Sequence, residues 1–557
     1  MRPSGSRAAI LLVVLPLTFL GVFYFYPLFE IFSMSLAPGG QWDPGAISAL
    51  FSTGSTLKVL WFTTWQAALS TVLTVALALP ATYVFARYRF PGKSLIQSCI
   101  AVPFVLPSVV VAAAFSALLG DKGLLNEWLM GIWGLSSPPI RLEQSLAFIL
   151  MAHVFYNFTV VLRIVGGFWS RLHPDLSHAA QVLGASPWKA FWKVTFPVLR
   201  PGIMAASLLV FIFCFSSFGV ILILGGPRYA TIEVAIYRQA VHLFNLPMAA
   251  ALSLLQICFM FVFMWVYTRL QRSASVPFTP ESLKTTQRDI VTNRDRIVVW
   301  GTVFLIFLFL GSPLLALVVR SLSTGSGVSL LYYRAIFENI GQSVFYVPPV
   351  AAIGYSVMFA LAALVMSLCI GLPVAIFLSR DRGLATSLLD PLFMLPLATS
   401  AVTLGFGYIV ALDEPPLNLR ASPIIVPLAH TLVAYPFVVR SILPGLRSIP
   451  EHIRESAVLL GAAPGKVWWK VVAPMVRKSL AVGAIFAFTV SIGEFGATVF
   501  LARPEIPTVP LAIYRFLGQP GAMNYGQAMA MSTILMLVTT MGFLFLEKLR
   551  TGSGGEF

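Results

Sequence analysis

An acidic residue, Glu494, interrupts an otherwise uncharged run from Ser479 to Ala502. Ionisable side chains inside apolar segments usually face a cavity or a partner, because a charge in hydrocarbon is costly. A carboxylate in this position suits the binding of a cationic solute, to which aromatic rings nearby add an attraction. The alternative is structural: Glu494 pairs with an arginine or caps a broken helix beside Gly493 and Gly496.

Two histidines, His153 and His430, also lie in apolar segments, 277 positions apart. Their more ordinary interpretation is a structural hydrogen bond within the protein. At the same offset the counterpart of Glu494 is Ser217, so the two stretches differ chemically. If these segments line a path for a solute, the candidate residues are Glu494, Phe495, Ser217, Phe218, His153, Tyr156, Asn157 and His430.

The sequence contains no motif for covalent or metal chemistry. The segment Arg87–Ser94, RYRFPGKS, ends like a phosphate-binding loop, but arginine occupies the place of the first glycine and no strand precedes it. The four cysteines all lie inside apolar runs, where ordinary packing is expected. We therefore predict that the chain is not an enzyme and has no catalytic residue, metal site or cofactor of its own.

The composition indicates that these residues lie in a membrane protein. Of the 557 residues, 58% are hydrophobic and 10% are charged, whereas soluble domains carry about 25% charged residues. Uncharged runs of about 20 residues, long enough to cross a bilayer, recur along the chain. The predicted fold is an all-α integral membrane protein with about twelve spans, near 8–34, 57–86, 95–119, 145–169, 202–224, 248–268, 297–319, 351–379, 384–411, 423–446, 479–501 and 525–546.

The formal net charge of +16 is distributed in a way that argues against nucleic-acid binding. The basic residues gather in alternate loops, which is the positive-inside pattern of membrane proteins and requires no polyanion. That pattern predicts that both chain ends lie in the cytoplasm and that the chain partners a lipid bilayer.

A stretch that mixes lysines, tryptophans and prolines occurs twice. His178–Arg200 reads HAAQVLGASPWKAFWKVTFPVLR, and Glu455–Arg477 reads ESAVLLGAAPGKVWWKVVAPMVR, in register 277 positions later. Each copy follows the fourth predicted span of its half, which indicates two parallel six-span repeats. The predicted organisation is a first repeat at 1–270 with its loop at 174–200, a cytoplasmic linker at 271–296, a second repeat at 297–550 with its loop at 450–477, and a flexible tail or scar of cloning at 551–557.

The doubled loop has the pattern of two short helices. Gly184 suits the end of the first helix, and Ser186 can cap a second that begins with Pro187. Aromatic residues and lysines fall on different faces of that second helix, as in a helix that lies at a membrane surface. An interfacial anchor is therefore one interpretation, but two copies in register favour paired docking sites for a two-fold partner.

The doubled stretch resembles the EAA loop of permeases from binding-protein-dependent ABC importers. The matching residues are His178, Ala179, Ala180, Gly184 and Lys189 in the first copy, and Glu455, Ser456, Ala457, Gly461 and Lys466 in the second. The resemblance implies the type I importer fold in a bacterial inner membrane, two cytoplasmic ABC ATPase subunits that bind ATP and magnesium, and an external solute-binding protein. Because His178 stands in place of the usual glutamate, a salt bridge to the ATPase is expected only from Glu455.

Further segments resemble the fused thiamine-transporter permeases, namely WQAALS (65–70), RFPGK (89–93), AHVFYN (152–157), LGGPRYATIEVAIY (224–237) and SIGEFGA (491–497). The resemblance implies import of thiamine or a related cationic solute. The fused ferric-iron permeases share the loops and a similar acidic-Phe-Gly segment, and they are the runner-up. A twelve-span secondary transporter is a weaker alternative, since it leaves the doubled loop unexplained.

Overall fold

The structure is a computed structural model that describes residues 4–37, 41–43, 45–52, 54–274, 286–324, 327–338, 347–380, 384–413, 415 and 417–551. Parts of the predicted linker and most of the predicted tail lie outside these residues. Eleven described helices are long and apolar enough to cross a membrane, or up to twelve if the bent pair Leu388–Ala398 and Ala401–Ala411 is one span. The prediction of an all-α membrane protein with about twelve spans is confirmed.

The described chain forms two compact units. Unit 1 consists of 1–50, 236–254 and 326–557, and unit 2 of 51–235 and 255–325. Three helices contain boundaries between the units: α3 (Gly45–Ser52), α13 (Ile232–Tyr237) and α14 (Leu246–Ala274). The division into repeats at 1–270 and 297–550 stays a prediction about the sequence, because the compact units are cut differently.

Unit 2 is built around α8 (Leu146–Arg171), the most buried of its candidate spans. Ser145 caps this helix by accepting a hydrogen bond from the Phe148 amide at 3.2 Å. The other elements of unit 2 are α4 (Gly54–Arg87), β1 (Tyr88–Arg89), α5 (Lys93–Val105), α6 (Ser108–Leu119), α7 (Leu124–Trp133), α9 (Asp175–Val182), α10 (Pro187–Ala190), η3 (Phe191–Thr195), α11 (Phe196–Phe215), α12 (Gly219–Leu224), β2 (Arg288–Asp289), α16 (Asn293–Leu322) and β3 (Ser323–Thr324).

Unit 1 is built in the same way around α21 (Ile425–Arg447), which is 78% buried over its most apolar window. The other elements are α1 (Ser4–Leu20), η1 (Gly21–Phe25), α2 (Tyr26–Leu36), η4 (Arg238–His242), β4 (Gly327–Val328), α17 (Leu331–Ala335), α18 (Pro349–Arg380), α19 (Leu384–Met394), η5 (Leu395–Ala398), α20 (Ala401–Ala411), α22 (Glu451–Leu459), α23 (Pro464–Val467), η6 (Trp468–Val472), α24 (Ala473–Ile492), α25 (Thr498–Leu501), α26 (Val509–Leu517) and α27 (Ala522–Thr551). The fourth span of each repeat is therefore the central helix of a unit.

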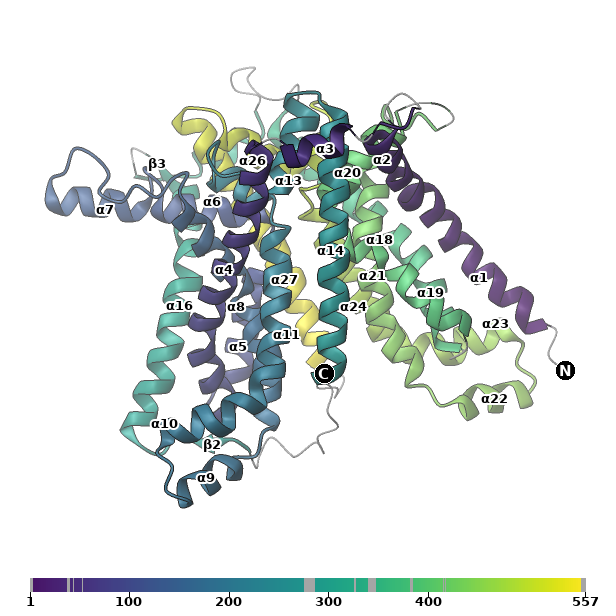
Figure 1. The fold of residues 1–557 in the computed structure, drawn as a ribbon, viewed down its shortest axis with the longest axis horizontal. Helices are drawn as coiled ribbons and strands as arrows, with labels where there is room; N and C mark the ends of the chain where they lie inside the picture. The colour runs from purple at the N-terminus through teal and green to yellow at the C-terminus, as the bar shows by residue number, and fades with distance from the viewer. Residues whose placement is uncertain are drawn as a thin grey trace. The chain divides into compact units, whose positions relative to one another are not determined.

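The first span of each repeat packs with helices of the other repeat. In unit 1, α1 lies against α18 and α2 lies against α20, and Figure 1 shows the purple α1 beside green helices from the second half of the chain. In unit 2, α16 packs on α6 and α4. Much of α16 is left exposed, including Phe304, Leu305 and Leu315, as expected of a helix that faces lipid.

Both predicted third spans are broken. In unit 2 the break is at Leu106, which is extended between α5 and α6. In unit 1 the two parts of the bent pair meet at 93°. Pro107 explains the first break, because a proline inside a helix removes a hydrogen bond and clashes with the preceding turn. In unit 1, Pro396 stands where α19 gives way to η5, just before the bend.

Candidate functional site

Both copies of the repeated loop fold in the same way. The first helix of each loop ends at a glycine in the left-handed region, with φ of +87° at Gly184 and +79° at Gly461. Glycine adopts this conformation without the penalty of a Cβ atom. The amide after each glycine donates to the carbonyl five residues back, at 3.0 Å from Ala185 to Ala180 and 3.1 Å from Ala462 to Ala457. Each glycine therefore closes its helix with a Schellman motif.

A second short helix follows each glycine and continues into a long span. Ser186 caps α10 by accepting a hydrogen bond from the Lys189 amide at 3.3 Å, and Pro187 occupies the first turn. A π-helical turn then joins α10 to α11, and a π-helical turn at the equivalent place joins α23 to α24. π-turns are rare and often occur at functional sites. Each loop is therefore continuous with the span that follows it.

The tips of both loops expose apolar side chains at equivalent positions. Val182 and Leu183 are 87% and 88% exposed, and Leu459 and Leu460 are 87% and 88% exposed. Neither α9 nor α22 buries a residue. Apolar surface that is held out on a short helix is typical of a docking site. The paired tips favour a protein partner over an anchoring role in lipid.

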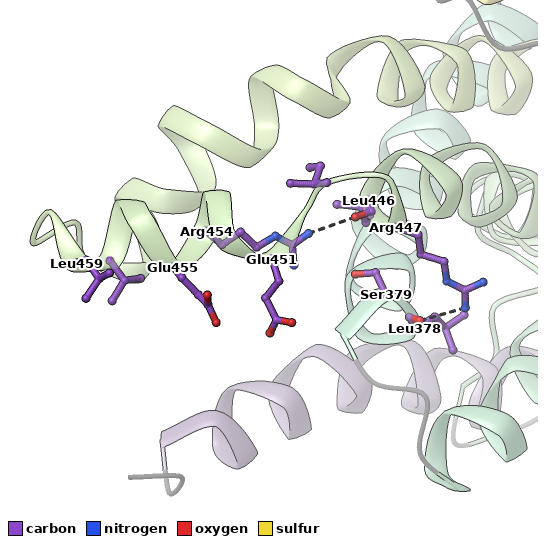
Figure 2. Close-up of a pocket in the computed structure, with 10 residues that line it drawn as sticks. Leu378, Ser379, Leu446, Arg447, Glu451, Arg454, Glu455 and Leu459 are labelled. Carbon is purple, nitrogen blue, oxygen red and sulfur yellow. Dashed lines mark hydrogen bonds between the residues drawn. The ribbon is translucent and has the colours of Figure 1, made fainter.

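The second loop borders a cavity of about 650 Å³, which the ends of α18 and α21 complete. Figure 2 shows Glu451 and Glu455 on this side of α22. The two arginines of the cavity donate to main-chain carbonyls, Arg454 to Leu446 at 3.3 Å and Arg447 to Leu378 at 3.2 Å. Among the described residues neither glutamate forms an ion pair, so both can receive a basic side chain from a partner.

The first loop has different charges at this place. The Nδ1 atom of His178, which replaces the glutamate, lies 3.9 Å from Asp175 Oδ1, and His173 Nδ1 lies 3.0 Å from Asp175 Oδ2. The Asp175 carboxylate thus contacts two histidines of its own loop. Of the other predicted loop residues, Ala180 and Ala457 are half-buried, whereas Ala179, Ser456, Lys189 and Lys466 are exposed.

The structure brings two predicted path residues of unit 1 together, His430 and Glu494. His430 Nδ1 lies 2.7 Å from Ser491 Oγ, and its Nε2 lies 2.8 Å from Thr498 Oγ1. Glu494 Oε2 lies 3.4 Å from the same Nε2 and accepts the Thr498 hydroxyl at 2.6 Å. These contacts are satisfied together when His430 carries its proton on Nε2.

The Glu494 side chain is bonded to its own loop. Its Oε1 atom accepts the Ala497 amide at 2.8 Å, and its Oε2 atom accepts the Thr498 amide at 3.0 Å. This is the capping arrangement that the sequence left open as an alternative. The loop also packs closely on α20, since a Cβ atom at Gly405 would lie 2.8 Å from Ala497 Cα. Glu494 therefore fixes the chain between α24 and α25, and its role toward a solute stays a prediction.

The equivalent cluster of unit 2 is neutral. His153 Nδ1 lies 2.9 Å from Ser70 Oγ, and its Nε2 lies 2.9 Å from Ser217 Oγ. Asn157 donates to the His153 carbonyl at 3.0 Å. Ser217 thus meets the same ring nitrogen that Glu494 approaches in unit 1, and only one of the two clusters contains a carboxylate. Phe218 and Phe495, which follow these residues, are 7% and 3% exposed.

Tyrosines satisfy the main chain where the third spans break. Tyr156 donates to the Leu106 carbonyl at 3.0 Å, and Tyr435 donates to the Phe393 carbonyl. Backbone groups freed in a membrane need such partners. Tyr156 therefore has a structural role in unit 2, and the sequence reasoning missed Tyr435, its functional equivalent in unit 1.

Two other features were missed. Glu233 is fully buried in unit 2 and accepts a hydrogen bond from Gln256 at 3.0 Å. The sequence could have indicated Glu233, because it is the one acidic residue of the apolar segment LGGPRYATIEVAIY. A second carboxylate is therefore buried in the protein besides Glu494.

The second missed feature is a clamp on the end of the linker. Strand β2 pairs in parallel with β1, and the Tyr88 hydroxyl donates to Asp295 at 2.8 Å. The Arg288 guanidinium lies 4.3 Å from the centre of the Tyr88 ring, within the range of a cation–π contact. Beside this clamp, burial, with the charge of Arg89 adding to it, lowers the pKa of Lys93 to about 8.

Comparisons of the sequence with known proteins find similar transport permeases. Residues 75–276 match the family described as the binding-protein-dependent transport system inner membrane component. The chain is 29% identical to the thiamine transport system permease protein of Escherichia coli (strain K12) over 88% of both chains. It is 27% identical to the protein of that description from Brucella abortus (strain 2308), over 83% of this chain and 82% of the relative.

A ferric transport system permease protein, from Actinobacillus pleuropneumoniae, is 24% identical over 94% of this chain and 76% of its own length. The region matched by the family contains the first loop and, from the His153 cluster, His153, Asn157 and Ser217.

Proposed function

We propose, from the match of residues 75–276 to the family of binding-protein-dependent transport system inner membrane components, that this chain is the permease of an ATP-driven importer for thiamine or a related cationic solute. Proteins of this family work with an ATPase and a solute-binding protein. Two ATPase subunits, which would bind ATP and magnesium, engage the two loops from the cytoplasm. Both chain ends lie on that side, as the distribution of basic residues predicts.

The observation that carries the proposal is the doubled loop. Two copies expose the same apolar tip, end at the same left-handed glycine and continue through the same π-turn into a span. A two-fold ATPase provides two equivalent surfaces for such a pair. The carboxylates of Glu451 and Glu455, which form no ion pair among the described residues, add a charge contact in the second loop only, so the two docking sites are unequal.

The mechanism follows from the continuity of each loop with its span. When the ATPase subunits close on ATP, they carry the loops with them, and α11 and α24 follow because no flexible segment intervenes. The permease then changes the side to which its path is open. The free energy for this change comes from tighter binding of the closed ATPase to one of the two states.

Thiamine is favoured as the solute because thiamine transport permeases are the more similar relatives. Those relatives are 27% and 29% identical, against 24% for the ferric relative. The residues proposed to line the path are those around His153 and His430. In the conformation described here Glu494 is held by its own loop, so it contributes to the path mainly by positioning Phe495.

Association with the ATPase subunit tests the proposal. The variant Gly461→Asp forces a side chain into the left-handed region and places a charge at the loop tip, and we expect it to lose the ATPase in a pull-down. Gly134→Asp is the matched control, because Gly134 is also exposed with a positive φ of +62° but lies in a loop after α7. Equal retention by both variants would contradict docking at the loop, and no association by the wild-type chain would favour a secondary transporter.

A further inference from the structure

A second repeated motif, unrelated to the docking loops, occurs at the opposite end of the spans. Residues 231–238 read TIEVAIYR, and residues 508–515 read TVPLAIYR, again 277 positions apart. The two segments share threonine at the start and Ala-Ile-Tyr-Arg at the end. The function proposed above does not use this motif, although identity at five of the eight positions predicts a shared structural role.

Both copies are held in place by the same device. The Ile232 amide donates to the Thr63 hydroxyl at 3.1 Å, and the Val509 amide donates to the Ser356 hydroxyl at 2.8 Å. Thr63 lies in α4 and Ser356 lies in α18, the second spans of their repeats. Each motif helix is therefore attached at its beginning to a long span and presents its tyrosine one and a half turns later.

The two tyrosines meet within unit 1. A hydrogen bond joins the hydroxyl groups of Tyr237 and Tyr514. The Tyr237 ring lies 5.5 Å from the Phe500 ring, and the Tyr514 ring lies 5.4 Å from the Phe495 ring. Tyr237 is only 5% exposed. Tyr514 is half-buried. Tyrosines at equivalent positions of the two repeats thus contact each other and the loop between α24 and α25.

Within unit 1, the pair lies at the far end of the spans from the second docking loop. In unit 1 the chain leaves the second loop through η6, follows α24 to Ile492 and reaches α26, which carries Tyr514. Within unit 1, Figure 1 shows α26 near the top and α22 near the bottom. If the docking loops face the cytoplasm, as the proposed function requires, the tyrosine pair faces the outside.

We propose that Tyr237 and Tyr514 form the outer closure of the transport path, and that they separate when the ATPase closes. Tyr237 belongs to the first repeat and Tyr514 to the second, and both lie in unit 1, so the closure opens when α13 and α26 part within that unit. One hydrogen bond between neutral groups and a few ring contacts are weak enough to break and re-form in every cycle. The hydroxyl groups make the closure specific, because alanine or phenylalanine in these positions would leave the partner hydroxyl without its bond.

This role also explains the position of Glu494. Its carboxylate orders the residues that follow it, and the rings on either side of that turn, Phe495 and Phe500, are the ones that support the two tyrosines. Glu494 is therefore a positioning residue for the closure. The proposal rests on the proposed function, since only an alternating-access permease needs such a closure.

Reactivity of a single cysteine tests the proposal. The variant Tyr514→Cys is prepared in a chain whose native cysteines, Cys99, Cys214, Cys258 and Cys369, are replaced by alanine. The assembled complex with ATPase and binding protein is placed in proteoliposomes and treated from outside with a membrane-impermeant maleimide. We expect labelling to be at least about fivefold faster after trapping with ATP and vanadate than without nucleotide. Equal rates in the two states would overturn the proposal.

Uptake by the phenylalanine and alanine variants is the second measurement. Tyr237→Phe keeps the ring and the fold but removes the hydrogen bond, and Tyr237→Ala opens the closure. We expect uptake of thiamine without the binding protein to rise in the order wild type, phenylalanine, alanine, by about tenfold in the last. The control is Tyr83→Ala, which removes a half-buried tyrosine at the end of α4 away from Thr63. This variant should leave the uptake without binding protein unchanged.

The two proposals fail in different ways. If the wild-type complex shows no ATP-dependent uptake of any solute, the proposed function is wrong. If the wild type transports thiamine while Tyr514→Cys labels at one rate in both states, and the tyrosine variants stay dependent on the binding protein, only the closure is wrong.

Discussion

Replacing Glu494 by glutamine is the sharpest single test of how the buried carboxylate works. The substitution keeps the size of the side chain and exchanges one acceptor oxygen for a donor group. In the native loop Oε1 accepts the Ala497 amide at 2.8 Å, while Oε2 accepts the Thr498 amide at 3.0 Å and its hydroxyl at 2.6 Å. Glutamine can accept at only one of these two places.

The expected loss in the free energy of unfolding follows from the acceptor oxygen that glutamine lacks. In either orientation of the glutamine amide, an NH₂ group faces a backbone N–H, and that buried donor loses its acceptor. A buried hydrogen-bonding group without a partner costs about 1–3 kcal/mol. A loss near the middle of that range lowers the melting temperature of a domain of 150–250 residues by roughly 4–8 °C, and that of the larger unit 1 by a few degrees.

The assay is thermal unfolding of the purified permease in detergent without solute, beside uptake by the reconstituted complex. Glu505→Gln is the matched control, because Glu505 is exposed in the following loop and its loss should leave the melting temperature unchanged. We expect Glu494→Gln to lower both the melting temperature and the rate of uptake. An unchanged melting temperature together with lost uptake would refute the positioning role and restore Glu494 as a direct ligand of the solute.

Three further predictions concern other parts of the structure. The pKa of Lys93 is lowered from 10.5 to about 8 in the folded protein. Between these pH values the unfolded chain binds more protons than the folded chain, so the free energy of unfolding should rise with pH. Lys93→Met should flatten this rise in thermal melts recorded from pH 7 to pH 10. Tyr88→Leu removes the ring against Arg288, and we expect faster tryptic cleavage after Arg288, with unchanged cleavage elsewhere. Gly405→Ala should destabilise unit 1 by about 1–3 kcal/mol through overpacking, whereas Gly354→Ala, which meets open space, should not; equal melting temperatures would contradict the close packing of the loop.

The repeated features were the most predictable part of the molecule. The offset of 277 predicted that His153 and His430 occupy equivalent places, and the structure gives both the same hydrogen bonding to hydroxyl groups. Gly184 and Ser186 predicted the end of one helix and the cap of the next, because both signals are local. Local signals and repeats can be interpreted from the sequence without knowledge of the tertiary fold.

Contacts between distant segments were not predictable in the same way. The helices α1 and α16 are apolar on most sides, so nothing in their sequences says which repeat they pack against. The meeting of Tyr237 with Tyr514 also depends on how the motif helices are attached to other spans. Glu494 illustrates the limit most clearly, since the same residue suits a solute ligand or a cap until its neighbours are placed.

The most direct test of the account is ATP hydrolysis by the permease assembled with its ATPase and binding protein in proteoliposomes. The account predicts that hydrolysis is stimulated when the binding protein carries thiamine, and that Gly461→Asp abolishes this stimulation while Gly134→Asp does not. Stimulation by ferric iron alone would keep the architecture and change the solute. A rate of ATP hydrolysis that neither solute stimulates and neither glycine variant changes would contradict the claim that the two loops couple an ATPase to transport.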